Sequence, residues 1–137
     1  MAMIIDASVA FKWFVSEPDS DRALALFDTA EALYAPDLVL TEVSNAMWAR
    51  LRNVDGDHGP AVKAAAGALP RMLTLLVPVA ELLPRAIDLA FDLQHPIYDC
   101  IYLALAEREK AALITADRRL IATASGGGHS ALVRALA

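Results

Sequence analysis

The sequence predicts an α/β fold in which a mostly parallel sheet is covered by helices on both faces. Short apolar runs of strand length alternate along the chain with longer segments whose apolar residues recur at helical spacing. Apolar residues make up 57 % of the chain, and the many alanines among them favour closely packed helices over a β-sandwich. The 137 residues match the usual length of one domain and show no change of composition, so we expect a single domain over 1–137.

Two strands and three helices are expected in the first half of the chain. An apolar run over 3–5 stops at Asp6 and has the composition of a buried parallel strand. Asp19 or Ser20 can cap a helix, and Pro36 has the fixed φ that suits the first turn of another. The expected elements are a strand over 3–5, a helix over 9–15, a helix from 20 to about 31, a short strand over 33–35 and a helix from 36 to about 52.

The second half is expected to continue this alternation after a polar, glycine-containing connection over 53–60. Residues 112–115 form the clearest strand, and the three glycines at 126–128 predict a flexible turn. The expected helices run from 61 to about 72, over 81–93, over 96–110 and from 117 to about 124, and the expected strands cover 73–79, 112–115 and, at an edge, 130–134.

Composition excludes several classes of protein. The single cysteine, Cys100, can form no intramolecular disulfide, and its place in an apolar helical pattern predicts a core position. The N-terminal segment lacks the basic stretch of a signal peptide, and the most apolar window, 72–83, contains Pro78 and Glu81, so we expect a cytoplasmic protein without a membrane segment. A net charge of −5 argues against a broad basic face, but bound divalent cations can reverse the sign of an acidic site.

Two acidic residues, Asp6 and Asp117, follow predicted strands directly. Ligands of open α/β sheets bind outside the carboxyl ends of the strands, so both carboxylates are candidates for a functional site. Each also has a structural explanation, because an aspartate at this place can cap the helix that follows it.

Glu42 and Asp99 lie on predicted helices. The helical spacing places Glu42 beside an apolar stripe, where a glutamate is costly unless it is paired or bound to metal. Asn45, three residues on, is expected to share that face, and the alternative for Glu42 is a boundary side chain that reaches water. Asp99 falls in the first turn after Pro96, where the helix dipole alone favours a negative charge.

The four carboxylates are more informative as a set. If two strand ends and two helices bring them into one cleft, their repulsion requires a cation. Ligation by oxygen alone suits Mg²⁺ or Mn²⁺, and such ions activate water and neutralise a phosphoryl transition state. The set therefore predicts phosphodiester hydrolysis.

The local settings of these acids resemble those of the PIN-domain ribonucleases, and in particular the VapC-type toxins of bacterial toxin–antitoxin pairs. The matching stretches span nearly the whole chain and lie at 4–8 (Ile-Ile-Asp-Ala-Ser), 41–46 (Thr-Glu-Val-Ser-Asn-Ala), 98–106 and 113–117. The resemblance implies a three-layer α/β/α sandwich and a Mg²⁺-dependent endoribonuclease. It also implies that Asp6, Glu42, Asp99 and Asp117 form an acidic quartet, with Ser8 and Thr115 as polar supports.

The same resemblance implies partners: RNA as substrate, a second copy in a homodimer, and a cognate antitoxin whose tail enters the active-site groove. Members often carry a further acid shortly after the last aspartate. This chain has Arg118, Arg119, Leu120 and Ile121 there, so only four acids are assigned and a second metal site stays open.

Lys12, Arg50, Arg118 and Arg119 are candidates for contacts to RNA phosphates, with ordinary solvated surface charge as the alternative for each. His95 stands near Asp99 but is taken as a loop histidine at a helix end, and residues 55–58 are taken as a solvated connection. Three other functions remain open: a housekeeping PIN-type nuclease without an antitoxin, an inert interaction module of the same fold, and a phosphoacceptor domain. The last is disfavoured because no second acid stands close to Asp6 in sequence.

Overall fold

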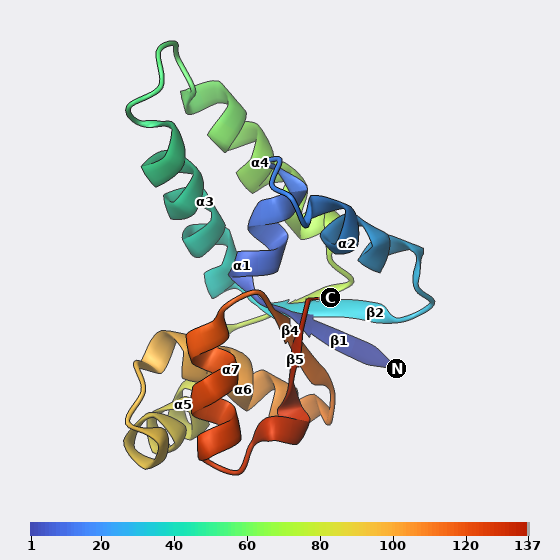
Figure 1. Cartoon of the computed structure of the whole chain (residues 1–137), viewed down its shortest axis with the longest axis vertical. Helices are drawn as coiled ribbons and strands as arrows, with labels where there is room; N and C mark the ends of the chain where they lie inside the picture. The colour runs from blue at the N-terminus through green and yellow to red at the C-terminus, as the bar shows by residue number, and fades with distance from the viewer. Residues whose placement is uncertain (137) are drawn as a thin grey trace.

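The central sheet has five strands, and every neighbouring pair runs parallel. A computed structural model describes residues 1–136 and gives the strand order β3-β2-β1-β4-β5 (Figure 1). The strands are β1 (Ala2–Ile5), β2 (Ala32–Pro36), β3 (Leu75–Val77), β4 (Ala112–Thr115) and β5 (Val133–Ala135). β1 lies at the centre, with Met3 aligned on Leu33 of β2 and on Ala112 of β4. The α/β prediction is therefore confirmed, with a sheet that is parallel throughout.

Helices cover both faces of the sheet, which makes a three-layer sandwich (Figure 1). Connections between parallel strands are right-handed crossovers. The chain first runs from β1 through β2 to β3 at one edge of the sheet, and then from β3 through β4 to β5 at the other edge. Because these two directions are opposite, the helices of the first part cover one face of the sheet and those of the second part cover the other. The first face carries α1 (Ala7–Ala10), α2 (Ser20–Leu24), α3 (Leu38–Leu51) and α4 (Gly59–Met72). The second carries α5 (Val79–Leu93), α6 (Ile97–Glu109) and α7 (Arg118–Gly126). Short 3₁₀ turns complete the chain: η1 (Phe11–Trp13), η2 (Ala25–Asp28) and η3 (Ser130–Leu132).

Helix α6 is the most deeply buried element. Every residue from Cys100 to Ala106 is buried, because α6 packs between α5 and the strands β1, β2 and β4. Cys100 is fully buried, which confirms its predicted core position, and this burial raises the pKa of the thiol to about 11. In residues 1–136, no helix is long and apolar enough to cross a membrane.

Pro36 does not open a helix, and that prediction is wrong. Pro36 is the last, buried residue of β2, and α3 begins at Leu38. The strand can end on a proline because the next residue, Asp37, donates its N–H to the Val77 carbonyl at 2.9 Å.

Other element boundaries also differ from the predicted ones. The helix expected over 9–15 is α1 followed by η1, because the Asp6 side chain accepts from the Ser8 N–H and starts the helix earlier. The helix expected to reach 31 ends with η2, where the Thr29 hydroxyl donates to the Leu26 carbonyl at 2.8 Å. The strands expected over 73–79 and 130–134 are shorter and are preceded by α4 and η3, respectively.

The sandwich predicts unequal costs for the same truncation at two strand positions. Leu113 is fully buried in β4, so Leu113→Ala should lower the free energy of unfolding by about 2–5 kcal/mol. Leu75 in edge strand β3 is 45 % exposed, so Leu75→Ala should cost less than about 1 kcal/mol. Urea denaturation of both variants measures the difference, and equal costs would contradict the central position of β4.

Candidate functional site: carboxylates at the switch point of the sheet

The strand order reverses between β1 and β4, and an acidic residue follows each of these strands. Asp6 comes directly after β1, and Asp117 comes two residues after β4. Both lie at the carboxyl edge of the sheet, at the switch point where α/β folds bind their ligands. The structure thus confirms the predicted strand-end positions of Asp6 and Asp117.

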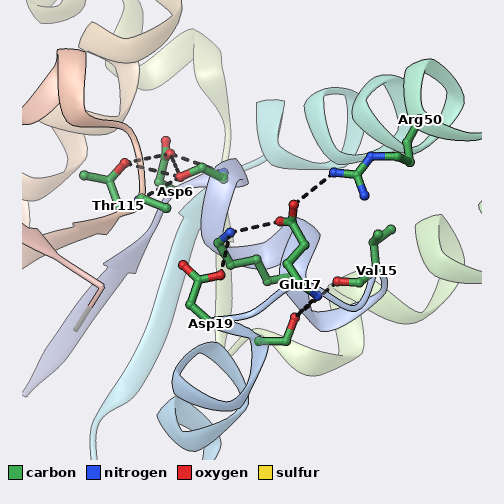
Figure 2. Close-up of polar contacts among 10 residues, drawn as sticks. Asp6, Val15, Glu17, Asp19, Arg50 and Thr115 are labelled. Carbon is green, nitrogen blue, oxygen red and sulfur yellow. Dashed lines mark hydrogen bonds and ion pairs between the residues drawn. The ribbon is translucent and has the colours of Figure 1, made fainter.

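Asp6 is a buried carboxylate held by hydroxyl groups. Its Oδ2 atom accepts from the Thr115 hydroxyl at 3.0 Å and from both the hydroxyl and the backbone N–H of Ser8 (Figure 2). Burial raises the pKa of Asp6, the hydrogen bonds from Ser8 and Thr115 oppose that effect, and the charge of Asp99 adds to it. The ionised carboxylate is therefore fixed in position yet disfavoured, and a bound cation would stabilise it.

Ser8 and Thr115 also join the two strand ends to each other. The Ala116 N–H donates to the Ser8 hydroxyl at 3.0 Å, and the Asp117 N–H donates to the Thr115 hydroxyl at 3.0 Å. The two residues predicted as polar supports therefore lie beside Asp6 and connect the β1–α1 turn with the β4–α7 turn.

Glu42 reaches the same region from α3. It is half-buried, and its Oε1 atom accepts from the hydroxyl of Tyr102 on α6 at 2.7 Å. Burial raises the pKa of Glu42, the Tyr102 hydrogen bond opposes this, and the charges of Asp6 and Asp99 add to it. Tyr102 itself is fully buried, and burial together with the three nearby carboxylates raises its pKa well above the ordinary value.

Asp99 stands in the first turn of α6 and is paired with His95. The His95 Nε2 atom lies 2.6 Å from Asp99 Oδ2, and the imidazole is almost entirely buried. His95, predicted to be a loop histidine, contacts Asp99, and Tyr102, for which the sequence predicted no role, contacts Glu42. Their spacing was the available signal, since residues three and four apart share one side of a helix and Tyr102 follows Asp99 by three.

Asp117, like Asp6, caps the helix that follows it. Its Oδ1 atom accepts from the N–H groups of Arg119 and Leu120, at 2.9 and 3.4 Å, so it caps α7. The charge of Asp99 adds to the raised pKa of Asp6, and the charges of Asp6 and Asp99 add to that of Glu42. The structure therefore brings Asp6, Glu42 and Asp99 near enough to interact through their charges, and it shows Asp117 as the cap of α7; a role of Asp117 in metal binding stays a prediction.

The donor set of this acidic cluster (Asp6, Glu42 and Asp99) consists of carboxylate oxygens, which suits a hard divalent cation. Within residues 1–136, no three Asp, Glu, His or Cys side chains are arranged as a ready-made metal cage. Mg²⁺ does not need one, because it keeps several waters and is bound through one or two carboxylates together with substrate phosphates. Three oxygen-only ligands that disfavour one another's charge fit such an ion.

Comparison of the sequence with known proteins identifies the family of this chain. Residues 3–126 match the family profile described as PIN domain. The chain belongs to the PIN-domain family. Among curated relatives, Ribonuclease VapC3 of Pyrobaculum aerophilum is 31 % identical over 121 residues, which cover 88 % of this chain and 92 % of that protein. Ribonuclease VapC9 of Mycobacterium tuberculosis and a VapC ribonuclease of Mycobacterium bovis are each 31 % identical over 118 residues, or 86 % of this chain and 87 % of theirs.

The basic residues predicted to contact RNA have different surroundings in this PIN domain. Lys12 Nζ lies 2.9 Å from carboxylate oxygens of both Glu17 and Asp19, and Arg50 lies 2.9 Å from Glu17 (Figure 2). Arg118 and Arg119 are exposed at the start of α7. Asn45 is also exposed, and its expected support of Glu42 stays a prediction, as do the four phosphate contacts.

Removing the Tyr102 hydroxyl should destabilise the PIN domain. Tyr102→Phe leaves the half-buried Glu42 carboxylate without its donor, so the free energy of unfolding should fall by about 1–3 kcal/mol. Tyr98 lies on the same helix and is 64 % exposed, so Tyr98→Phe is the matched control and should change stability by less than about 0.5 kcal/mol. Urea denaturation measures both, and equal stability of the two variants would show that the Tyr102–Glu42 bond contributes nothing.

Glu17 should give the stability of the fold a pH dependence. Hydrogen bonds from Lys12 and Arg50 hold the pKa of Glu17 below its ordinary 4.5, so its contribution is present above that pH and is lost as the pH falls through the folded-state pKa. Glu17→Gln should cost up to about 1 kcal/mol at pH 7 and progressively less at acid pH. Denaturation from pH 7 to 3 measures this against Glu31→Gln, and a cost that does not change with pH would contradict the pairing.

Proposed function

We propose that this PIN domain is a metal-dependent endoribonuclease that acts in the cytoplasm as the toxin of a toxin–antitoxin pair. The observation that carries the proposal is the acidic cluster, in which β1, α3 and α6 bring Asp6, Glu42 and Asp99 to the switch point of the sheet. RNA is favoured as the substrate because the relatives over most of the chain are ribonucleases by name.

The residues of the chain divide the work of hydrolysis. Asp6, Glu42 and Asp99 would hold Mg²⁺, for which Mn²⁺ could substitute, and the ion would supply activation of water and neutralisation of charge on the phosphoryl oxygens. Ser8 and Thr115 fix the Asp6 carboxylate, and Tyr102 fixes Glu42. Asp117 keeps the β4–α7 turn in place by capping α7, and we assign it the orientation of the attacking water. Unpaired RNA is the favoured substrate because its phosphodiesters are accessible.

Two protein partners belong to the proposal. An antitoxin that places an arginine against the acidic cluster would pair with the carboxylates and exclude the metal. A homodimer is supported by the outer face of α5, where Leu83, Ile87 and Phe91 recur every four residues and are 36 %, 37 % and 76 % exposed.

A housekeeping nuclease and an inert module of the same fold are the alternatives. Expression of the chain without an antitoxin distinguishes a toxin from a housekeeping nuclease, because a toxin arrests growth of its native host and a housekeeping enzyme does not. An inert module would tolerate loss of the acidic cluster, whereas this chain retains three acids that disfavour one another's charge.

Cleavage should depend on the metal and on the acidic cluster. Purified protein should cut single-stranded RNA with Mg²⁺ or Mn²⁺ and stop in EDTA, and Asp99→Asn should lower the rate by about 100-fold or more. Asp28→Asn, which changes an exposed aspartate of η2, is the control and should keep the wild-type rate. Gel analysis of end-labelled RNA measures the rates; equal cleavage in EDTA, or by Asp99→Asn, would refute the proposed chemistry.

A further inference from the structure

A pocket lies next to the acidic cluster. It has a volume of about 280 Å³ and is formed at the carboxyl ends of β4 and β5 together with α2 and α7. Its inner wall includes Thr115, whose hydroxyl donates to Asp6 at 3.0 Å, so one residue belongs to both sites. Thr115 and Asp19, two of its lining residues, are labelled in Figure 2.

The charged side chains of this pocket leave it positive. Arg22 and Arg118 both line it, both are exposed, and neither forms an ion pair within residues 1–136. Asp19 is the acidic residue of the lining, and its carboxylate is already bound by Lys12 Nζ at 2.9 Å. That hydrogen bond holds the pKa of Asp19 below its ordinary value, and the Arg22 charge adds a smaller effect in the same direction. Within residues 1–136, the guanidinium groups of Arg22 and Arg118 therefore form no ion pair of their own.

The rest of the lining closes the pocket around the two arginines. Ile121, Ala135 and Leu136 form this part of the lining. The wall is fixed in place, because the Leu136 N–H donates to the Thr115 carbonyl at 2.9 Å. The amide groups at the start of α7 are capped by Asp117, so the positive charge comes from the two arginines.

We propose that the Arg22–Arg118 pocket binds an RNA phosphate next to the one that is cleaved. This inference rests on the proposed ribonuclease function and assigns a substrate subsite to it. Guanidinium groups match the geometry of phosphate oxygens, and a polyanion that approaches the acidic cluster of a chain with net charge −5 needs a local cation. The bound group is either an internal phosphodiester or a phosphate at the end of the RNA.

Binding of RNA without cleavage tests the pocket directly. The probe is a 12-nucleotide single-stranded RNA with a 3′ fluorescein, prepared with a 5′ hydroxyl or a 5′ phosphate, and anisotropy is read in EDTA at several salt concentrations. The double variant Arg22→Gln with Arg118→Gln should bind about tenfold more weakly. Its slope of log K against log salt should be about 1.4 smaller, since each contact to single-stranded RNA contributes about 0.7. Arg71→Gln, an exposed arginine at the end of α4 on the other edge of the sheet, is the matched control.

The outcomes separate the sources of the phosphate and the two proposals. Equal weakening for both RNAs assigns the pocket to an internal phosphodiester, and weakening confined to the 5′-phosphorylated RNA assigns it to a terminal phosphate. Three results would overturn the subsite: unchanged binding by the double variant, an equal loss of binding in Arg71→Gln, and no RNA binding by the wild type in EDTA. The arginines would then be left to bind an acidic protein segment. A wild type that binds RNA through these arginines but does not cut it with Mg²⁺ refutes the ribonuclease function and leaves the arginines as an RNA-phosphate site that serves no cleavage.

Discussion

Burial of the Asp6 carboxylate beside Glu42 and Asp99 is the constraint on which the rest of this site depends. A buried anion close to two others is costly, and the hydroxyl groups of Ser8 and Thr115 offset only part of the cost. Those hydroxyl groups also accept from the backbone of the β4–α7 turn, so the fold around Asp6 and the junction of two strands are stabilised together. A cation that neutralises the cluster would remove most of the remaining penalty.

The architecture explains how carboxylates far apart in sequence reach one another. Helix α6 crosses under the centre of the sheet and presents Asp99 and Tyr102 on one side, where Tyr102 meets Glu42 of α3. On the other side of Asp6, Lys12 and Arg50 share Glu17 and so join η1 to the last turn of α3. The basic residues on this side therefore differ in their contacts. Lys12 and Arg50 form ion pairs with carboxylates, whereas Arg22 and Arg118 line the pocket and form no ion pair within residues 1–136.

Much of the fold could be read from the sequence, because β1 and β4 are short buried apolar runs and parallel strands must be joined by helices. Pro36 could not, since its φ suits a helix start and a strand end equally well, and only pairing with β3 decides between them. The acids at the ends of β1 and β4 were predictable from topology. The pairing of Glu42 with Tyr102 and of Asp99 with His95 was not, because those contacts depend on how α3 and α6 pack.

Mutual repulsion of the three carboxylates should destabilise the metal-free protein until a cation binds. Thermal melting of Glu42→Gln tests this repulsion most directly. Glutamine keeps the shape of the side chain and an oxygen that can accept from Tyr102, and it replaces the second carboxylate oxygen with an uncharged NH₂ group. In EDTA the variant should melt at or above the wild-type temperature, and excess Mg²⁺ should stabilise the wild type more than the variant. A variant that melts below the wild type in EDTA and shows the same shift with Mg²⁺ would contradict the claim and leave Glu42 as a structural partner of Tyr102.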